Sequence, residues 1–353
     1  MRSWRMTRTS SAPSGAVARR AVARPRSIVL ALLCVLASAP PPAICEGERP
    51  PDETGPGAGD HPGGRTLALG EGRVYVETEG SGPPLVLLPA GPGLDHAYFH
   101  PYLSSLAPYA TVVYLDPRGC GRSGSRPAAE YTLEAMADDL EALRRDLGFV
   151  TLDLLGHGMG QAVATLYADR HPERVGRLIF LGASRRAASF LDGAGLAQKE
   201  TGDMRRALER AESDRYLSAD GRLRERFRIL APLMFHRLTD RAFHKAFVDQ
   251  ITASAAVRGA MSDRLAAGAA DLSAPLGRLK APLLIIAGRY DPTAPVAEAE
   301  ALRDAVAGSR LAVLEESGSF PFAEQPVEFL RIVREFLGVG AGRKEGAGAG
   351  GGI

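Results

Sequence analysis

The chain has 353 residues, of which 45% are apolar, and this is enough to bury one large core. Its formal net charge of +2 is misleading, because seven of its 43 basic residues are arginines within the first 26 positions. The rest of the chain has 36 basic and 41 acidic residues, and the two signs of charge are interspersed along the sequence. This balance argues against a basic surface for nucleic acid or membrane, so nucleic acid is not an expected partner.

The arginine-rich start leads into an apolar stretch over residues 28–39, which small residues and prolines follow. This layout is typical of a secretory signal, so we interpret residues 1–45 as the signal segment of an exported protein, periplasmic or extracellular. A stretch of twelve residues is shorter than the roughly 20 that cross a bilayer, and no stable membrane span is expected. Cleavage after Ala39 and cleavage after Cys45 both remain open, and a lipid anchor at Cys45 is the less favoured alternative.

Two segments flank the predicted fold. Residues 46–64 are rich in Pro, Gly, Glu and Asp, which predicts a disordered linker before a fold that begins near Arg65. Residues 339–353 form a Gly/Ala-rich tail, which we also expect to be disordered. Of the three cysteines only Cys120 lies within the predicted fold, so no disulfide framework is expected.

Short β-branched and leucine-rich runs alternate with helical patterns from residue 65 to residue 338. Such alternation predicts an α/β fold with a mostly parallel sheet and helices on both faces. Apolar residues recur at three- and four-residue spacing over 132–147, which predicts an amphipathic helix, and a last helix is expected over 326–337. The predicted strands are Val74–Thr78, Leu85–Leu88, Thr111–Leu115, Leu152–Leu155, Leu178–Leu181, Leu283–Ala287 and Leu311–Leu314.

The alternation stops over residues 184–279. This segment carries charged amphipathic patterns without a convincing strand, which predicts an inserted helical cap. Open α/β sheets hold their ligands at the carboxyl ends of the strands, so a cap above that edge would shape a pocket.

A glycine-rich turn follows the strand that ends at Leu155. Residues 156–160 read GHGMG and lead into a helix, which is the strand–turn–helix context of a nucleophile elbow with Gly158 at the position of the serine. A dinucleotide-binding loop is the alternative, but that pattern requires glycine where Gln161 stands. The turn therefore favours the elbow, and no cofactor is expected.

Further motifs follow the predicted strands in order: PAGPG at 89–93, LDPRGCGRS at 115–123, GRYD at 288–291 and ESGSFPFAEQP at 316–326. Together with the elbow they resemble the proline-iminopeptidase-like branch of the α/β-hydrolase superfamily. The resemblance covers about residues 65–338. It implies an α/β-hydrolase fold, with a mostly parallel central sheet flanked by helices and an inserted helical cap over about 184–279.

The resemblance also implies a catalytic triad of nucleophile, acid and histidine, in that chain order. The corresponding positions hold Gly158, Asp291 and Ser319. Glycine has no atom that attacks a carbonyl, and a serine hydroxyl is no general base near neutral pH. Ordinary serine hydrolysis is therefore not expected, although the backbone N–H groups of Gly91 and Met159 are implied to remain as oxyanion donors.

Other side chains offer no clear replacement. None of the seven histidines follows Asp291, as the family order requires. We interpret His157 as a structural neighbour of the elbow, and His96 and His100 as solvated residues at a helix start. Cys120 is interpreted as a turn residue rather than a substitute nucleophile. No group of histidines and carboxylates has metal-ligand spacing along the sequence, so no metal is expected.

Three functions remain open. The first is a non-catalytic homologue that binds a small molecule or a protein, with Asp291 either contacting the ligand or holding a turn. The second is a lyase or isomerase that uses Asp291 and the oxyanion donors, and the third is residual esterase or aminopeptidase-like hydrolysis. Prolyl specificity does not carry over, because the oxyanion motif begins with Pro89 instead of histidine and the only tryptophan is Trp4.

Overall fold

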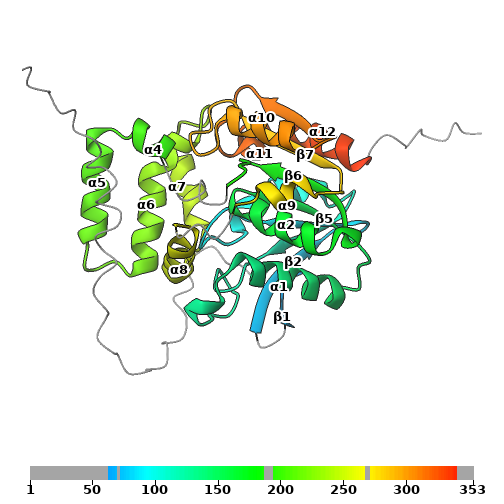
Figure 1. Ribbon diagram of the computed structural model, residues 1–353. Coiled ribbons are helices and arrows are strands. Elements are labelled where there is room, and N and C mark those ends of the chain that lie inside the picture. The colour runs from blue at the N-terminus through cyan, green and yellow to red at the C-terminus, as the bar shows by residue number, and fades with distance from the viewer. Residues whose placement is uncertain (1–62, 70–71, 187–193, 267–270, 340–353) are drawn as a thin grey trace, which may run out of the picture. The chain divides into compact units, whose positions relative to one another are not determined.

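An eight-stranded sheet forms the centre of the computed structural model, which describes residues 63–69, 72–186, 194–266 and 271–339 (Figure 1). The strand order is β1-β2-β4-β3-β5-β6-β7-β8, and β2 runs antiparallel to both of its neighbours. All the other neighbouring strands pair in parallel. The bounds are β1 Arg65–Leu69, β2 Gly72–Glu79, β3 Pro84–Leu88, β4 Thr111–Leu115, β5 Leu152–His157, β6 Val175–Leu181, β7 Leu283–Gly288 and β8 Arg310–Leu314.

The seven predicted strands and the mostly parallel sheet are confirmed. Strand β1 was not predicted as a strand, because only two of its five residues are buried and its apolar alternation is short. Every residue of β5 and of β7 is buried. This burial explains why β7 is a continuous apolar run, whereas β5 also buries the polar side chains of Asp153 and His157.

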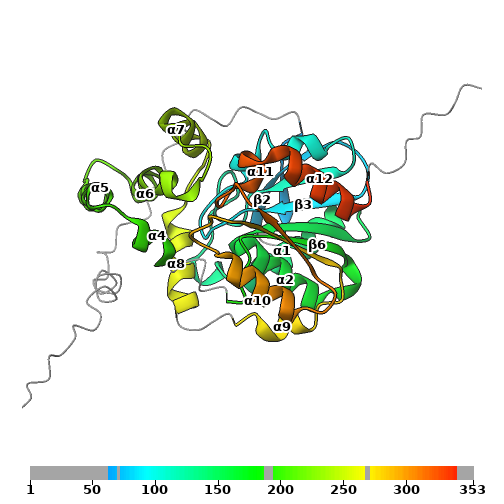
Figure 2. The ribbon, with the colours of Figure 1, turned by 90° about the horizontal axis from the view of Figure 1, so that it is seen from above.

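Helices cover both faces of this sheet, as Figure 2 shows. On one face, α1 (Leu133–Asp146), α2 (Met159–Arg170), α9 (Ser273–Gly277) and α10 (Val296–Ala305) pack against alternate strand residues such as Leu88 and Val113. The intervening residues, such as Leu87 and Val112, face the other layer. That layer consists of η1 (Ala97–Phe99), η2 (Leu103–Leu106), α11 (Pro321–Glu324) and α12 (Pro326–Leu337).

The predicted helix over 132–147 is confirmed as α1. The side chain of Thr132 caps its first turn by accepting a hydrogen bond from the backbone N–H of Ala135 at 3.0 Å. Its spaced apolar residues, including Met136 and Leu140, are buried against the sheet. The predicted last helix is confirmed as α12.

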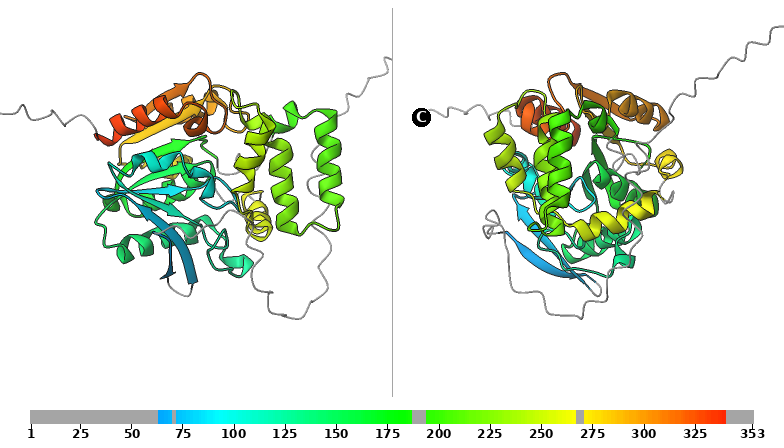
Figure 3. Two further views of the ribbon diagram at one scale, coloured as in Figure 1. Left: turned by 180° about the vertical axis from the view of Figure 1, so that it is seen from behind. Right: turned by 90° about the vertical axis from the view of Figure 1, so that its left-hand side faces the viewer.

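Between β6 and β7 the described residues form helices and no strand, apart from two isolated bridges, Arg186 with Asp271 and Ala253 with Leu94 (Figures 1 and 3). We call α4 to α8 the helical insertion. It contacts the core where the backbone N–H of Ser254 donates to Gly93 O at 2.7 Å, and again where Ser319 N–H donates to Met234 O at 2.8 Å. The helices are α4 Ala194–Lys199, α5 Gly202–Ser213, α6 Ala219–Met234, α7 Arg241–Asp249 and α8 Ala255–Ala266.

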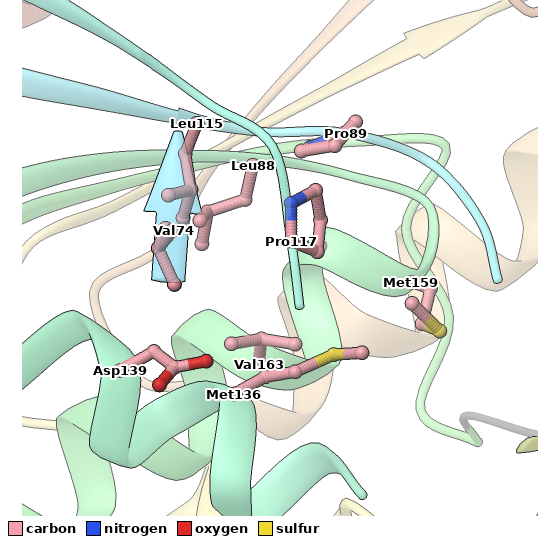
Figure 4. A pocket seen from close by; sticks show the side chains of 10 residues that line it. Val74, Leu88, Pro89, Leu115, Pro117, Met136, Asp139, Met159 and Val163 are labelled. Atoms are coloured by element: carbon pink, nitrogen blue, oxygen red, sulfur yellow. The ribbon is translucent and has the colours of Figure 1, made fainter. Parts of the chain in front are cut away.

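A small apolar cavity of about 20 Å³ lies between the sheet and helices α1 and α2 (Figure 4). Leu88 and Leu115 border it from the strands, and Met136 and Val163 border it from the helices. This volume is about the size of one water molecule. The cavity is therefore a packing void on the α1–α2 face and too small for a substrate.

The described residues all belong to the unit Thr54–Ile353. Within them we find no helix whose length and apolar character would suffice to cross a bilayer. The predictions for the signal segment, for most of the linker and for residues 340–353 of the tail lie outside the described residues.

Candidate functional site

The turn between β5 and α2 has the conformation of an elbow. Gly158 lies at φ 51° and ψ −116°, a region in which a residue with a side chain is strained by about 1–3 kcal/mol. Its N–H donates to Leu181 O at 2.9 Å, and its carbonyl accepts from Gln161 N at 3.0 Å. A Cβ on Gly160 would lie 2.3 Å from Leu88 O, so that glycine is required for α2 to pack on β3. The turn keeps a tight backbone whose tip carries no reactive side chain.

Asp291 and Ser319 meet at the carboxyl ends of β7 and β8. The hydroxyl of Ser319 donates to Asp291 Oδ1 at 2.7 Å. The same oxygen accepts from the backbone N–H and the hydroxyl of Thr293, at 2.8 and 2.7 Å, and from Ala294 N at 3.3 Å. Burial raises the pKa of Asp291, and these hydrogen bonds act in the opposite direction. The carboxylate therefore stabilises the turn after β7. The hydroxyl of Ser319 binds the carboxylate at the place where the imidazole of a catalytic histidine would bind.

His157 links three loops of the site through hydrogen bonds. The phenol of Tyr98 accepts from the backbone N–H of Ala90 at 2.7 Å and lies 3.0 Å from His157 Nδ1. Burial lowers the pKa of His157 to about 4, and a hydrogen bond to the backbone of Ser319 offsets this only partly. The ring is therefore neutral, and Tyr98 donates to Nδ1 while the ring donates to Ser319. This arrangement supports the interpretation of His157 as a structural neighbour.

The neutral state of His157 predicts a pH-dependent stability. Its pKa falls from 6.5 in the unfolded chain to about 4, so the unfolded state gains a proton first as the pH drops. The free energy of unfolding should decline from pH 6.5 and level off near pH 4, with a total loss of about 3 kcal/mol at 1.36 kcal/mol per pKa unit. We expect His157→Gln to show a weaker decline between pH 7 and pH 4 in urea denaturation.

His171→Gln, which changes a histidine after α2 outside this network, is the matched control and should keep the native pH dependence. If His157→Gln declined as steeply as the native chain, His157 could not be the buried neutral group.

The two residues expected to provide oxyanion donors lie next to each other. A Cβ built on Gly91 would lie 3.0 Å from Met159 Cε. Met159 is the first residue of α2, where backbone N–H groups have no acceptor within the helix. The structure thus brings Gly91 and Met159 together beside the elbow turn, while the neighbouring Ala90 N–H is occupied by Tyr98.

Cys120 is 1% exposed, and burial raises the pKa of its thiol, as do nearby carboxylates such as Asp116. A protonated, inaccessible thiol does not attack substrates, which agrees with its interpretation as a turn residue.

The interpretation of His96 and His100 as solvated residues was wrong. His96 is 4% exposed, and the side chain of His100 is 14% exposed. Both pack against β2 and β4, where Glu77 and Asp116 lie beside their rings. The sequence contained one signal for the burial of these histidines, which is Glu77. A carboxylate within an apolar strand needs a polar partner when it is buried.

The fold also brings together one group of histidines and a carboxylate that has no metal-ligand spacing along the sequence. Glu77, His96 and His100 each direct a ligand atom to within 4.8 Å of the others. The sequence did not indicate this cluster because Glu77 lies on β2, whereas the two histidines flank η1.

Sequence reasoning also missed Glu324, which ties the helical insertion to the loop of Ser319. Its Oε1 accepts from the backbone N–H groups of His236 and Arg237 at 2.6 and 2.7 Å, and its Oε2 accepts from Gly318 N at 2.5 Å. Beside it the ring of His236 stacks on that of Tyr290 with 3.6 Å between centroids. Glu324 therefore positions Ser319 relative to the insertion.

Residues 83–326 match the family model described as alpha/beta hydrolase fold. The chain is 30% identical over 273 residues to a pimeloyl-[acyl-carrier protein] methyl ester esterase of Aeromonas hydrophila, covering 75% of this chain and 99% of that protein. It is 29% identical to a proline iminopeptidase of Lactobacillus helveticus, covering 72% and 90%. The solved structure of a thermophilic esterase from Thermogutta terrifontis is similar, with a TM-score of 0.61, 26% identity and coverage of 78% and 97%.

Proposed function

This chain belongs to the α/β-hydrolase fold family, and we propose that it is an exported member that has lost serine hydrolysis and binds a small molecule at the carboxyl ends of its strands. The loss of hydrolysis is supported first by Gly158, which offers no nucleophile at the tip of the elbow. It is supported further by Ser319, which occupies the position of the base.

The hydrogen bond from Ser319 to Asp291 carries the proposal. At 2.7 Å it fills the acceptor that would otherwise orient an imidazole. With three further donors on the same oxygen, Asp291 is committed to the turn after β7. The four hydrogen bonds on Oδ1 leave only Oδ2 of Asp291 for a proton transfer, which weighs against a lyase or isomerase in which Oδ1 is the base.

What remains of the site suits a ligand with a carbonyl or carboxylate oxygen. The N–H of Met159 lies at the start of a helix, where partial positive charge gathers, and Gly91 lies beside the side chain of the same residue. The names of similar proteins point to ligands of this kind, since they include a methyl ester esterase and a semialdehyde hydrolase. Export is supported by the arginine-rich start and the apolar stretch that follows it.

The test combines turnover and binding on the full chain. We expect no hydrolysis of activated esters or prolyl amides above a heat-denatured control, and no change with Asp291→Asn. Ligand binding to the folded state should raise the melting temperature in a screen of small carboxylic acids and esters. Turnover by the native chain that Asp291→Asn abolishes would overturn the loss of hydrolysis. An absence of any thermal shift across the screen would count against small-molecule binding.

A further inference from the structure

Two imidazoles and a carboxylate converge between β2 and the loop that follows the oxyanion motif. We propose that Glu77, His96 and His100 bind a divalent transition-metal ion, with Zn²⁺ as the preferred metal. These three residues take no part in the proposed loss of hydrolysis, so the two proposals are independent.

The spacing of the ligand atoms fits a common ion. His96 Nε2 lies 3.4 Å from Glu77 Oε1, and His100 Nε2 lies 3.2 Å from Glu77 Oε2. Two ligands of a tetrahedral zinc ion, each about 2.0–2.1 Å from the metal, lie about 3.3 Å apart. The three ligand atoms all fall within 4.8 Å of one another, so small side-chain rotations would bring them to one ion.

The surroundings of His96 are those of a metal ligand. Its Nδ1 lies 2.6 Å from Asp116 Oδ1, which also accepts from the His96 backbone N–H at 3.1 Å. A carboxylate on Nδ1 keeps the proton on that nitrogen when a metal displaces the proton of Nε2, so that Nε2 binds the metal, and it raises the basicity of the ligand. The ring of His100 has a similar orientation, because its Nδ1 lies 3.4 Å from Ser104 Oγ and its Nε2 is on the side of Glu77. Both rings thus direct Nε2 toward Glu77.

The charges around the cluster favour a cation. The carboxyl groups of Glu77, Asp95 and Asp116 are all buried within this region. The guanidinium of Arg122 reaches Glu77 Oε1 at 2.8 Å and offsets one negative charge. A divalent ion would compensate the remaining charge, whereas protons on the two imidazoles are the competing way to do so.

A metal ion at this position would affect the loop that carries Gly91. His96 and His100 flank η1, and Tyr98 of η1 hydrogen-bonds both Ala90 N and His157. A metal that clamps η1 to β2 would therefore rigidify the loop that carries Gly91. We expect the ion to be structural rather than catalytic, because four strands of the sheet separate β2, which carries Glu77, from β7, which leads to Asp291.

The experiment measures metal content and spectrum on the full chain, purified without a polyhistidine tag. The protein is stripped with EDTA, equilibrated with Zn²⁺, freed of excess metal and analysed by plasma mass spectrometry. We expect about one Zn²⁺ per chain, a rise in melting temperature with Zn²⁺ but not with Mg²⁺, and a visible absorption band of low-coordinate Co²⁺ when cobalt replaces zinc.

His100→Gln and Glu77→Gln should each lose the bound metal and the cobalt band. His236→Gln removes a histidine outside the cluster and should keep both. His100 is the more exposed of the two histidine ligands, so its variant is the one most able to fold, and Glu77→Gln gives a second isosteric test. Substoichiometric zinc in the native chain, below about one tenth per chain, would overturn the proposal, and so would equal zinc in native and His100→Gln proteins.

Discussion

Gly158→Ser combined with Ser319→His should give the chain esterase activity about 10³-fold or more above the native protein, because the members of a triad act as a unit. The elbow backbone already has the geometry that the serine needs. Asp291 Oδ1 lies 2.7 Å from the hydroxyl that the imidazole would replace. Activity is measured as release of nitrophenolate from short-chain esters, together with the pH–rate profile, which should show the loss of activity in acid that a histidine base produces.

Each single variant is the control for the double one. Gly158→Ser alone lacks a base, and Ser319→His alone lacks a nucleophile, so both should stay near the native rate. Ser319 is buried, so the larger imidazole requires local repacking, and the melting temperature of each variant is recorded beside its activity. A folded double variant no faster than the singles would contradict the view that the scaffold of the site is intact.

Glu324→Ala should destabilise the protein by about 2–3 kcal/mol, because the buried backbone N–H of Gly318 and the partly buried N–H groups of His236 and Arg237 would lose their acceptor. Glu324 is 7% exposed, so water can replace its carboxylate only in part. The effect is measured as the shift of the urea midpoint. Glu324 also binds the loop that carries Ser319, so its loss should disturb the site. When Glu324→Ala is added to the Gly158→Ser, Ser319→His variant, kcat for ester hydrolysis should fall.

Glu328→Ala is the matched control, because this exposed glutamate on α12 pairs only with Arg331 among the described residues. Exposed ion pairs contribute little, so its urea midpoint should stay close to that of the native chain. Glu324→Gln should lie between the two, since an amide keeps one acceptor oxygen but presents N–H groups to a backbone donor. Equal midpoints for Glu324→Ala and Glu328→Ala would show that Glu324 does not tie the insertion to the core.

The sequence by itself determined most of the fold. Strand β7, which is buried on both faces, is apolar throughout, and α1 repeats its apolar residues at helical spacing, so both are visible in a short window of residues. The motifs that resemble the α/β-hydrolase pattern also assigned Gly158, Asp291 and Ser319 to the positions of the triad. Each follows a strand of the same parallel run, and the carboxyl ends of such strands lie on one edge. The assignment of residues 1–45 to export stays a prediction.

Only the tertiary structure decided how these residues are paired. The hydrogen bond of Ser319 with Asp291, the three donors on Glu324 and the burial of His96 and His100 beside Glu77 all join residues from different elements. Periodicity reports which face of an element is buried, but it does not report which polar groups meet there. Buried polar groups need partners, and those partners are often far away in the chain: His236 and Glu324 are 88 residues apart. The strands and helices could therefore be predicted from local patterns in this sequence. The hydrogen bonds and ion pairs of the site could not, because they join residues that only the folded chain brings together.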